Sequence, residues 1–268
     1  MMGRFIKLTL LMYILYAAVM YAYIFHLGDA AIPEQFKGTS ADPAMFMDER
    51  QLLLSEEYSE IRNYLFFLEA PLGWIFFFIL LGLGISSKLE GASLGSASRP
   101  FLQRSIYFFY ISILSYAFYF PLNYISYRLS GKYGISTQSF SQWMRDDVID
   151  FWVNYGTSLL MVLVLCHLMS KYAKHWWLYL WFASIPFILF FMFVKPVVID
   201  PLYNDFYPLK NKDLETKILS MAEEAGIPAD HVYEVNMAEK TNAMNAYVTG
   251  IGSNSRIVLW DTTMNKLG

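Results

Sequence analysis

Cysteine, charged residues and basic clusters are all scarce in this sequence. Cys166 is the only cysteine, which excludes an intramolecular disulfide and a metal cluster held by several thiolates. Charged residues make up only 16% of the chain, against about 25% in a typical soluble domain. The net charge is −3, and no Lys/Arg stripe carries interleaved aromatic residues. Together these shortages argue against a soluble protein and against nucleic acid as a partner.

Apolar residues, in contrast, are abundant and come in long blocks. Hydrophobic residues are 56% of the chain, aromatic residues are 18%, and the mean hydropathy is +0.34. A helix that crosses a bilayer needs about 20 apolar residues, and this pattern predicts a mainly α, polytopic membrane protein with about five such spans. The expected spans cover about residues 5–26, 71–85, 105–124, 151–170 and 176–197.

The five spans define an expected transmembrane domain over residues 1–197, in contact with the lipid bilayer of the plasma membrane. A cleaved signal peptide is the alternative interpretation of the first block, but the spans that follow favour a retained helix. Lys and Arg are densest before the first span, in residues 86–104 and in residues 171–175. The positive-inside rule then puts the N-terminus in the cytoplasm and residues 198–268 outside.

Between the spans we expect mostly loops. Residues 27–65 are polar and acidic, and residues 48–68 could form an amphipathic helix that leads into the second span. Pro71 suits the first turn of a helix and predicts that the second span begins there. Residues 86–104 are predicted to be a loop rich in Gly and Ser, and residues 125–150 a polar loop.

Residues 198–268 have a different character and predict a small, partial α+β domain. An aromatic, turn-rich connector precedes a helix with one apolar face, which Gly226 and Pro228 end. Residues 232–237 alternate like a strand. Two runs rich in β-formers, 245–250 and 256–262, then flank the polar turn 252–255 and predict a β-hairpin. Asp261 and Thr262 are good N-cap residues, so a helix should follow.

Three motifs in this region resemble one known family. They are Pro201-Leu202-Tyr203-Asn204 with Phe206 and Pro208-Leu209, then Asn245-Ala246-Tyr247-Val248-Thr249-Gly250, and finally Ile257-Val258-Leu259-Trp260-Asp261-Thr262. In order and spacing they resemble the M48 membrane zinc metallopeptidases, in the CAAX prenyl protease (Ste24) branch. The resemblance is specific over residues 199–262 and architectural over residues 1–198. It implies a gluzincin-like peptidase domain that begins in residues 198–268.

The resemblance also implies a Zn²⁺ cofactor and a His-Glu-x-x-His helix shortly after Thr262. None of the four histidines is followed by Glu-x-x-His, so we predict no catalytic residue and no metal ligand in this chain. Two histidines one helical turn apart are needed to build such a zinc site. We therefore expect an N-terminal part of such a protease, inactive alone, with the zinc ligands supplied by the full-length protein.

By resemblance, the strand that begins at Asn245 presents a free edge to a peptide or protein substrate, which pairs with it through backbone groups. Asn245 and Ala246 would flank the scissile bond, and Tyr247 would pack inward as support. The alternative is that Asn245 and Tyr247 merely build the hairpin.

Three classes of function compete. The first is the N-terminal part of an integral-membrane zinc endopeptidase, supplying the anchor and the edge strand. The second is a non-catalytic relic that binds peptides or regulates. The third, a transporter or channel, has little support, because no span carries a clear run of charged residues. The branch name implies prenylated C-termini as substrates, and small membrane peptides are an equally open choice.

Overall fold

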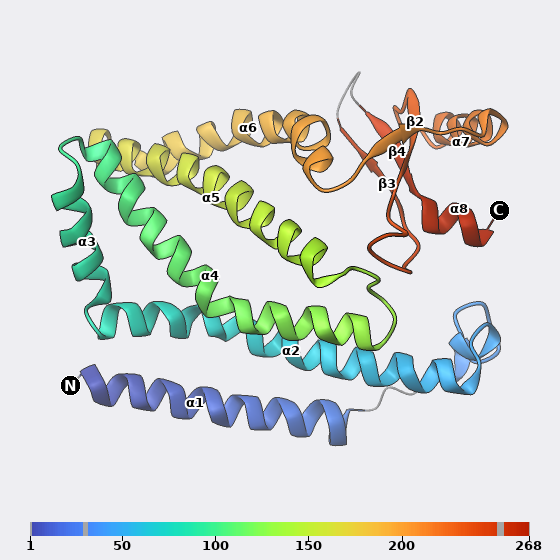
Figure 1. The fold of residues 1–268 in the computed structure, drawn as a ribbon, viewed down its shortest axis with the longest axis horizontal. Coiled ribbons are helices and arrows are strands. Elements are labelled where there is room, and N and C mark those ends of the chain that lie inside the picture. The colour runs from blue at the N-terminus through green and yellow to red at the C-terminus, as the bar shows by residue number, and fades with distance from the viewer. Residues whose placement is uncertain (1, 29–31, 251–254, 268) are drawn as a thin grey trace. The chain divides into compact units, whose positions relative to one another are not determined.

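The computed structural model describes residues 2–28, 32–250 and 255–267 (Figure 1). The chain divides into two compact units, Met1–Tyr133 and Gly134–Gly268. In the described residues, five helices are long and apolar enough to cross a bilayer, and each predicted span overlaps one of them. They are Gly3–Leu27, Glu49–Gly82, Pro100–Lys132, Phe140–Lys171 and Trp176–Leu202. The predicted mainly α, polytopic fold class is confirmed.

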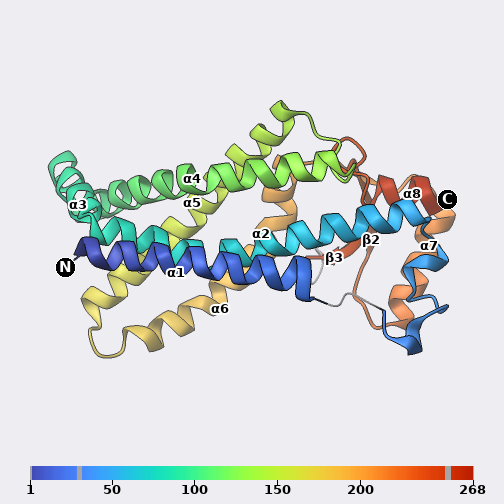
Figure 2. The same cartoon turned by 90° about the horizontal axis from the view of Figure 1, so that it is seen from below.

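The first unit is built from four helices. They are α1 (Met2–Ala22), α2 (Glu49–Gly82), α3 (Ile85–Ser96) and α4 (Pro100–Lys132). A π-helical turn at Tyr23–Leu27 extends α1, and two 3-10 turns, Glu34–Phe36 and Pro43–Met45, precede α2. Both views show α1 alongside α2 (Figures 1 and 2).

The predicted helix start at Pro71 is wrong, because α2 begins at Glu49 and contains Pro71. Asp48 caps the helix: its carboxylate accepts from the Gln51 amide at 2.8 Å, and the Gln51 side chain accepts from the Asp48 amide at 3.0 Å. This capping box satisfies amides that would otherwise have no partner. The amphipathic helix expected over residues 48–68 therefore exists and runs into the span without a break.

Pro71 is tolerated because a neighbouring helix satisfies the carbonyl that it leaves without a donor. A proline has no N–H, so the carbonyl four residues earlier, that of Phe67, loses its helical hydrogen bond. The Tyr16 hydroxyl of α1 donates to this carbonyl at 3.0 Å, and the Tyr13 hydroxyl donates to the next carbonyl, Leu68, at 3.1 Å. Rescue by neighbouring side chains is what a proline inside a membrane helix requires.

The loop predicted over residues 86–104 is also wrong, since most of it forms α3. Gly84, at φ +66°, turns the chain between α2 and α3, and Pro100 begins α4. The serines fit into the helix because Ser93 and Ser96 donate to the carbonyls of Glu90 and Ala92, at 2.8 and 2.7 Å. Their hydroxyls are thus satisfied inside the helix itself.

The second unit begins with two long helices, α5 (Phe140–Lys171) and α6 (Trp176–Val194). Ser139 caps α5 with a second capping box. The polar loop predicted over residues 125–150 shrinks to the short connection between α4 and α5, because both helices extend into polar sequence beyond the bilayer-length apolar run. A π turn at Lys195–Ile199 and a 3-10 turn at Asp200–Leu202 lead from α6 to the sheet.

The sheet has four strands in the order β1-β2-β4-β3. They are β1 (Phe206–Pro208), β2 (His231–Val235), β3 (Ala246–Thr249) and β4 (Arg256–Trp260). β2 and β4 are parallel, and the other two pairings are antiparallel. The predicted hairpin is confirmed as β3–β4; its predicted turn falls largely on residues 251–254, outside the described residues. The short strand β1 was predicted only as part of the connector.

Two helices accompany the sheet. α7 (Lys212–Glu224) ends where predicted, with Gly226 at φ +68°. α8 (Asp261–Leu267) is the helix that the Asp-Thr pair predicted. The apolar face of α7 packs on a core of buried residues, which includes Leu209, Ala222, Val232, Ile257 and Leu259.

Candidate functional site

The strand that carries the predicted site residues lies at one edge of the sheet. β3 pairs with β4 on one side, with Tyr247 opposite Val258. On its other side no strand of the described residues pairs with it. β3 is therefore an open edge within the part of the chain that the structure describes.

The register decides which backbone groups of β3 point outward. The Trp260 amide donates to the Asn245 carbonyl at 3.0 Å, so Asn245 and Trp260 form a hydrogen-bonded pair. In an antiparallel ladder such pairs alternate, and Tyr247 and Thr249 consequently face β4. The amides and carbonyls of Ala246 and Val248 are left pointing away from the sheet. Their side chains are also exposed, whereas those of Tyr247 and Thr249 are partly buried.

Asn245 is fixed at the start of this edge. Its amide donates to the Thr263 hydroxyl, and that hydroxyl donates to its carbonyl, both at 2.9 Å. Its side-chain oxygen accepts from the Ala246 amide at 2.9 Å. The Asn245 side chain thus already occupies one of the two outward amides of β3.

Tyr247 lies half-buried in the sheet. Burial raises the pKa of its phenol, the negative charge of Asp200 raises it further, and Arg256 opposes the shift. The phenol therefore stays neutral at physiological pH. Of the three predicted site residues, Asn245 and Ala246 are exposed and Tyr247 is not, and all three lie together at the start of β3.

Side chains of α8 bind the segment that leads into β3. One carboxylate oxygen of Asp261 accepts from the amides of Met237 and Ala238, each at 2.8 Å. The Thr262 hydroxyl donates to the Ala243 carbonyl at 2.6 Å, and the Lys266 ammonium donates to the Asn242 carbonyl at 2.8 Å. These bonds fix α8 to the chain that enters the open edge.

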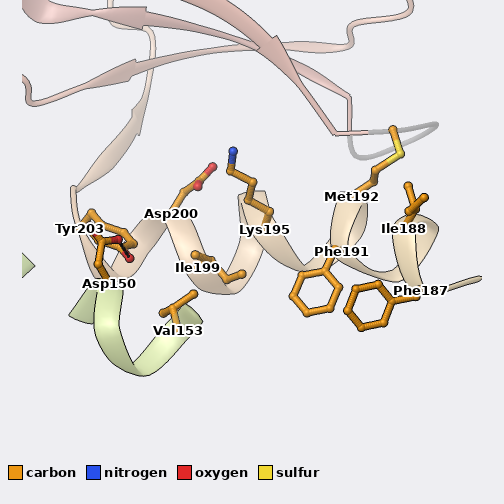
Figure 3. A pocket seen from close by; sticks show the side chains of 10 residues that line it. All are labelled: Asp150, Val153, Phe187, Ile188, Phe191, Met192, Lys195, Ile199, Asp200 and Tyr203. Atoms are coloured by element: carbon orange, nitrogen blue, oxygen red, sulfur yellow. Dashed lines mark hydrogen bonds between the residues drawn. The ribbon is translucent and has the colours of Figure 1, made fainter. Parts of the chain in front are cut away.

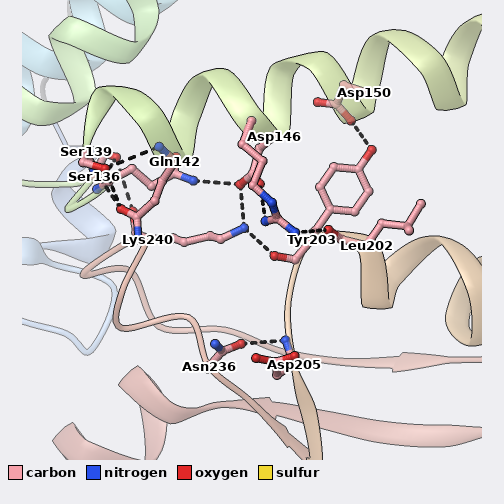
Figure 4. A network of polar contacts seen from close by, with 12 residues as sticks. Ser136, Ser139, Gln142, Asp146, Asp150, Leu202, Tyr203, Asp205, Asn236 and Lys240 are labelled. Atoms are coloured by element: carbon pink, nitrogen blue, oxygen red, sulfur yellow. Dashed lines mark hydrogen bonds and ion pairs between the residues drawn. The ribbon is translucent and has the colours of Figure 1, made fainter.

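The same segment is held from its other side by α5 (Figure 4). Lys240 donates to the Asp146 carboxylate at 2.5 Å and to the Tyr203 carbonyl at 2.7 Å. The Tyr203 hydroxyl donates to the Asp150 carboxylate at 2.5 Å. Burial, followed by this bond, raises the pKa of Tyr203 far above its ordinary value, so Tyr203 acts here as a hydrogen-bond donor.

Arg256 joins the end of α6 to the sheet. Its guanidinium donates to the Pro196 carbonyl and lies over the rings of Tyr233 and Phe206, at 5.0 and 5.4 Å from their centroids. Cation–π contacts of this kind are stronger when the pair is shielded from water. The connector between α6 and the sheet is therefore held at both ends, by Arg256 and by Tyr203.

A pocket of about 530 Å³ lies along α5, α6 and this connector (Figure 3). Its helical wall is apolar, with Phe187, Phe191 and Val153 among the lining residues, and Asp150, Lys195 and Asp200 bring charge to it. In Figure 3 the side chains of Lys195 and Asp200 lie on the side facing the sheet.

A zinc ion does not fit the side chains of this region. Within residues 2–28, 32–250 and 255–267, no group of three or more His, Cys, Asp or Glu is placed to hold a metal. We therefore derive no catalytic step from these residues. What the geometry offers is hydrogen bonding to an extended backbone along β3.

Sequence reasoning found the edge strand but missed the residues that hold it. The sequence pattern places Asp146 in a polar loop, and no local signal predicts a role for Lys240 or Thr263. Lys240 and Asp146 are 94 residues apart, so no local spacing links them. The Asp261-Thr262 pair predicts a helix start, but it does not predict that these side chains bind residues 237–243.

Comparison with known proteins places this geometry in a family. A family model described as the CAAX prenyl protease N-terminal region with five membrane helices matches residues 25–205, and the Peptidase family M48 model matches residues 208–268. The uncharacterized metalloprotease YhfN of Bacillus subtilis is 52% identical over 266 residues, covering 99% of this chain and 62% of the relative. CAAX prenyl protease 1 of Saccharomyces cerevisiae is 28% identical over 158 residues, 58% of this chain and 35% of the relative.

The fold has a counterpart among solved structures. The crystal structure of S. mikatae Ste24p superposes with a TM-score of 0.79 at 19% identity, covering 97% of this chain and 61% of that one. The chain thus spans about three fifths of the length of YhfN and of the Ste24p structure. On the two family matches, the chain belongs to the M48 peptidases, in the CAAX prenyl protease branch with its five N-terminal membrane helices.

Proposed function

We propose that this chain forms the membrane-anchoring and substrate-holding part of an integral-membrane zinc metalloendopeptidase of the plasma membrane. Residues 1–197 would anchor the protein in the membrane and form part of the wall of a chamber around the active site, and residues 198–268 would form the first part of the peptidase domain. The observation that carries the proposal is the open edge of β3, which begins beside the first turn of α8, where the Asn245 amide donates to the Thr263 hydroxyl. Zn²⁺ would be held by residues of the full-length protein outside this chain.

The substrate would be an extended peptide that adds a strand to β3. It would pair with the outward groups of Ala246 and Val248, because these are the backbone groups that β4 does not use. Such pairing depends on backbone and not on side chains, so it aligns a peptide bond without reading sequence. The side-chain amide of Asn245 would turn from the Ala246 backbone N–H to the peptide. Asn245 and Ala246 would then flank the scissile bond, and Tyr247 would support the strand from its buried side.

The gene beyond the codon for residue 268 gives the first test. The proposal requires a His-Glu-x-x-His helix that continues from α8, and a zinc content that depends on those histidines. A gene product that binds extended peptides at β3 and does not cleave them would favour the alternative, a non-catalytic peptide-binding or regulatory protein.

Asn245→Ala in the full-length protein tests the site itself. Loss of one peptide hydrogen bond should lower kcat/KM by about tenfold, with the zinc content unchanged. Asn63→Ala, which removes an exposed asparagine of α2 in the other unit, is the matched control. Unchanged cleavage by Asn245→Ala would remove Asn245 from the site.

The substrate class can be tested with the same preparation. The names of several relatives, such as CAAX prenyl protease 1, suggest peptides with a prenylated C-terminus. Backbone pairing along β3 does not require a prenyl group. Matched peptides with and without the prenyl group should therefore both be cleaved, and strict dependence on prenylation would show that the edge is not the main source of affinity.

A further inference from the structure

The segment between β2 and β3, residues 236–245, is held between two helices. On one side α8 binds it through Asp261 and Thr262 of its first turn and Lys266 of its last turn. On the other side the start of α5 and the residues before it bind it. Every bond described here joins residues within the unit Gly134–Gly268. The position of β3 therefore depends on how firmly this segment is held.

Hydrogen bonds to backbone carbonyls also hold this segment on the α5 side. The Thr137 amide donates to the Lys240 carbonyl at 3.0 Å, and the Asn242 amide donates to the Ile135 carbonyl at 2.9 Å. The Asn242 side chain also donates to the Gly134 carbonyl at 2.8 Å. These bonds lie only a few residues before Asn245, where the open edge begins.

One ion pair among these contacts is shielded from solvent. The side chains of Lys240 and Asp146 are only 15% and 17% exposed, whereas those of the surface pair Lys37–Glu34 are 53% and 87% exposed. Shielded charges attract more strongly than exposed ones.

Asp146 also pairs with the exposed Arg145 at 3.3 Å, so loss of Lys240 removes its shielded partner only. Asp146 also accepts from the Gln138 side chain at 2.8 Å, and Lys240 also donates to the Tyr203 carbonyl at 2.7 Å. Figure 4 shows the Lys240 ammonium between Asp146 and Tyr203.

We propose that Lys240 and Asp146 are positioning residues that fix the β3 edge for peptide pairing. Neither lies on the outward side of β3, so they act through residues 240–245 and do not touch the peptide. This inference rests on the proposed function of the edge. Without the pair, residues 237–245 keep their bonds to α8 but lose their ionic tie to α5, and β3 then samples positions in which its outward groups do not match a peptide.

The effect should appear in KM more than in kcat. Strand pairing holds the bound substrate and the transition state alike, and loss of such uniform binding raises KM and leaves kcat nearly unchanged. We expect Lys240→Met in the full-length protein to raise KM by about tenfold, which corresponds to about 1.4 kcal/mol of binding free energy. Lys240→Arg keeps the charge and should restore most of the affinity.

A double-mutant cycle of Lys240→Met and Asp146→Asn is the decisive test. Because both substitutions break the same ion pair, the double variant should raise KM little more than Lys240→Met alone. Lys210→Met, at an exposed lysine before α7, is the matched control and should leave KM unchanged. A KM that Lys240→Met leaves unchanged, or effects of the two substitutions that simply add, would overturn the proposal.

Hydrogen exchange on the full-length protein in detergent gives a readout that does not depend on cleavage. In Lys240→Met the amides of Tyr247 and Thr249 should exchange about tenfold faster, an opening free energy lower by about 1.4 kcal/mol, with α7 unchanged. Equal exchange in β3 would overturn the positioning role even if the variant cleaves poorly.

The failure of this inference can be told from failure of the proposed function. If Asn245→Ala raises KM and Lys240→Met does not, the edge binds peptide but the ion pair does not position it. If Lys240→Met loosens β3 while neither variant alters cleavage, the pair holds the strand and the edge is not the substrate site.

Discussion

Helix α6 exposes its apolar side chains, whereas the sheet region buries them. No residue of α6 is buried, and Trp181 and Phe190 are 58% and 55% exposed. In the sheet region, Leu209, Val232, Val235 and Val258 are at most 1% exposed. The sheet is stabilised by removing apolar surface from water. The exposed apolar face of α6 gains little from such burial, because lipid tails are as apolar as its side chains. The same apolar residue types therefore contribute differently to the free energy of unfolding in the two regions.

The largest expected effect is at the centre of the sheet. Val258→Asp puts an unpaired carboxylate between β2 and β3 at a side chain that is 0% exposed, and should destabilise the sheet by roughly 4 kcal/mol. Limited proteolysis in detergent should then cleave residues 206–260 while α5 and α6 persist. Val248→Asp, at an exposed position on β3, is the control and should stay resistant.

A matched pair of truncations sharpens the comparison. Leu209→Ala, at 1% exposed, should cost about 3 kcal/mol of unfolding free energy, because it leaves a cavity in the core. Leu189→Ala on α6, at 44% exposed, should cost less than about 1 kcal/mol, since lipid replaces the lost contacts. Reversible unfolding in mixed micelles measures both. Equal costs would show that α6 is packed against protein and not against lipid.

A smaller effect is expected where α1 meets Pro71 of α2. Tyr16→Phe leaves the Phe67 carbonyl without a donor and should weaken the α1–α2 contact by about 1 kcal/mol. In the background Pro71→Ala, the new amide supplies that hydrogen bond, and Tyr16→Phe should then cost much less. Unfolding of the four variants gives the coupling energy, and additive costs would contradict the pairing of Tyr16 with the proline.

The smallest effect is a pH response before α2. The amides of Gly38 and Ala44 hold the pKa of Asp42 below its ordinary value, so its carboxylate stabilises the turn above the unfolded pKa. That stability is lost as the pH falls through the folded pKa. Protease susceptibility of residues 32–47 should rise in acid, and Asp42→Asn should flatten this response. An identical acid response in both proteins would rule Asp42 out as its source.

The sequence predicted elements whose signal is local and missed those whose cause is distant. α6 follows from its apolar run, α7 from its one-sided pattern, and the β3–β4 hairpin from two short runs of β-formers. The amphipathic start of α2 near Asp48 was predicted, but its continuity through Pro71 was not, because an apolar run reports the length of a span and not where the helix begins. The Lys240–Asp146 pair could not be predicted, since only the fold brings together residues so far apart in the chain.

The Asn245 side chain has one more consequence for the whole molecule. An unprotected strand edge can template the addition of further copies, and natural proteins usually blunt such edges. β3 is only four residues long, and its first outward amide is already occupied by Asn245. Its shortness and this occupied amide both blunt the edge against pairing with the same edge of a neighbouring copy.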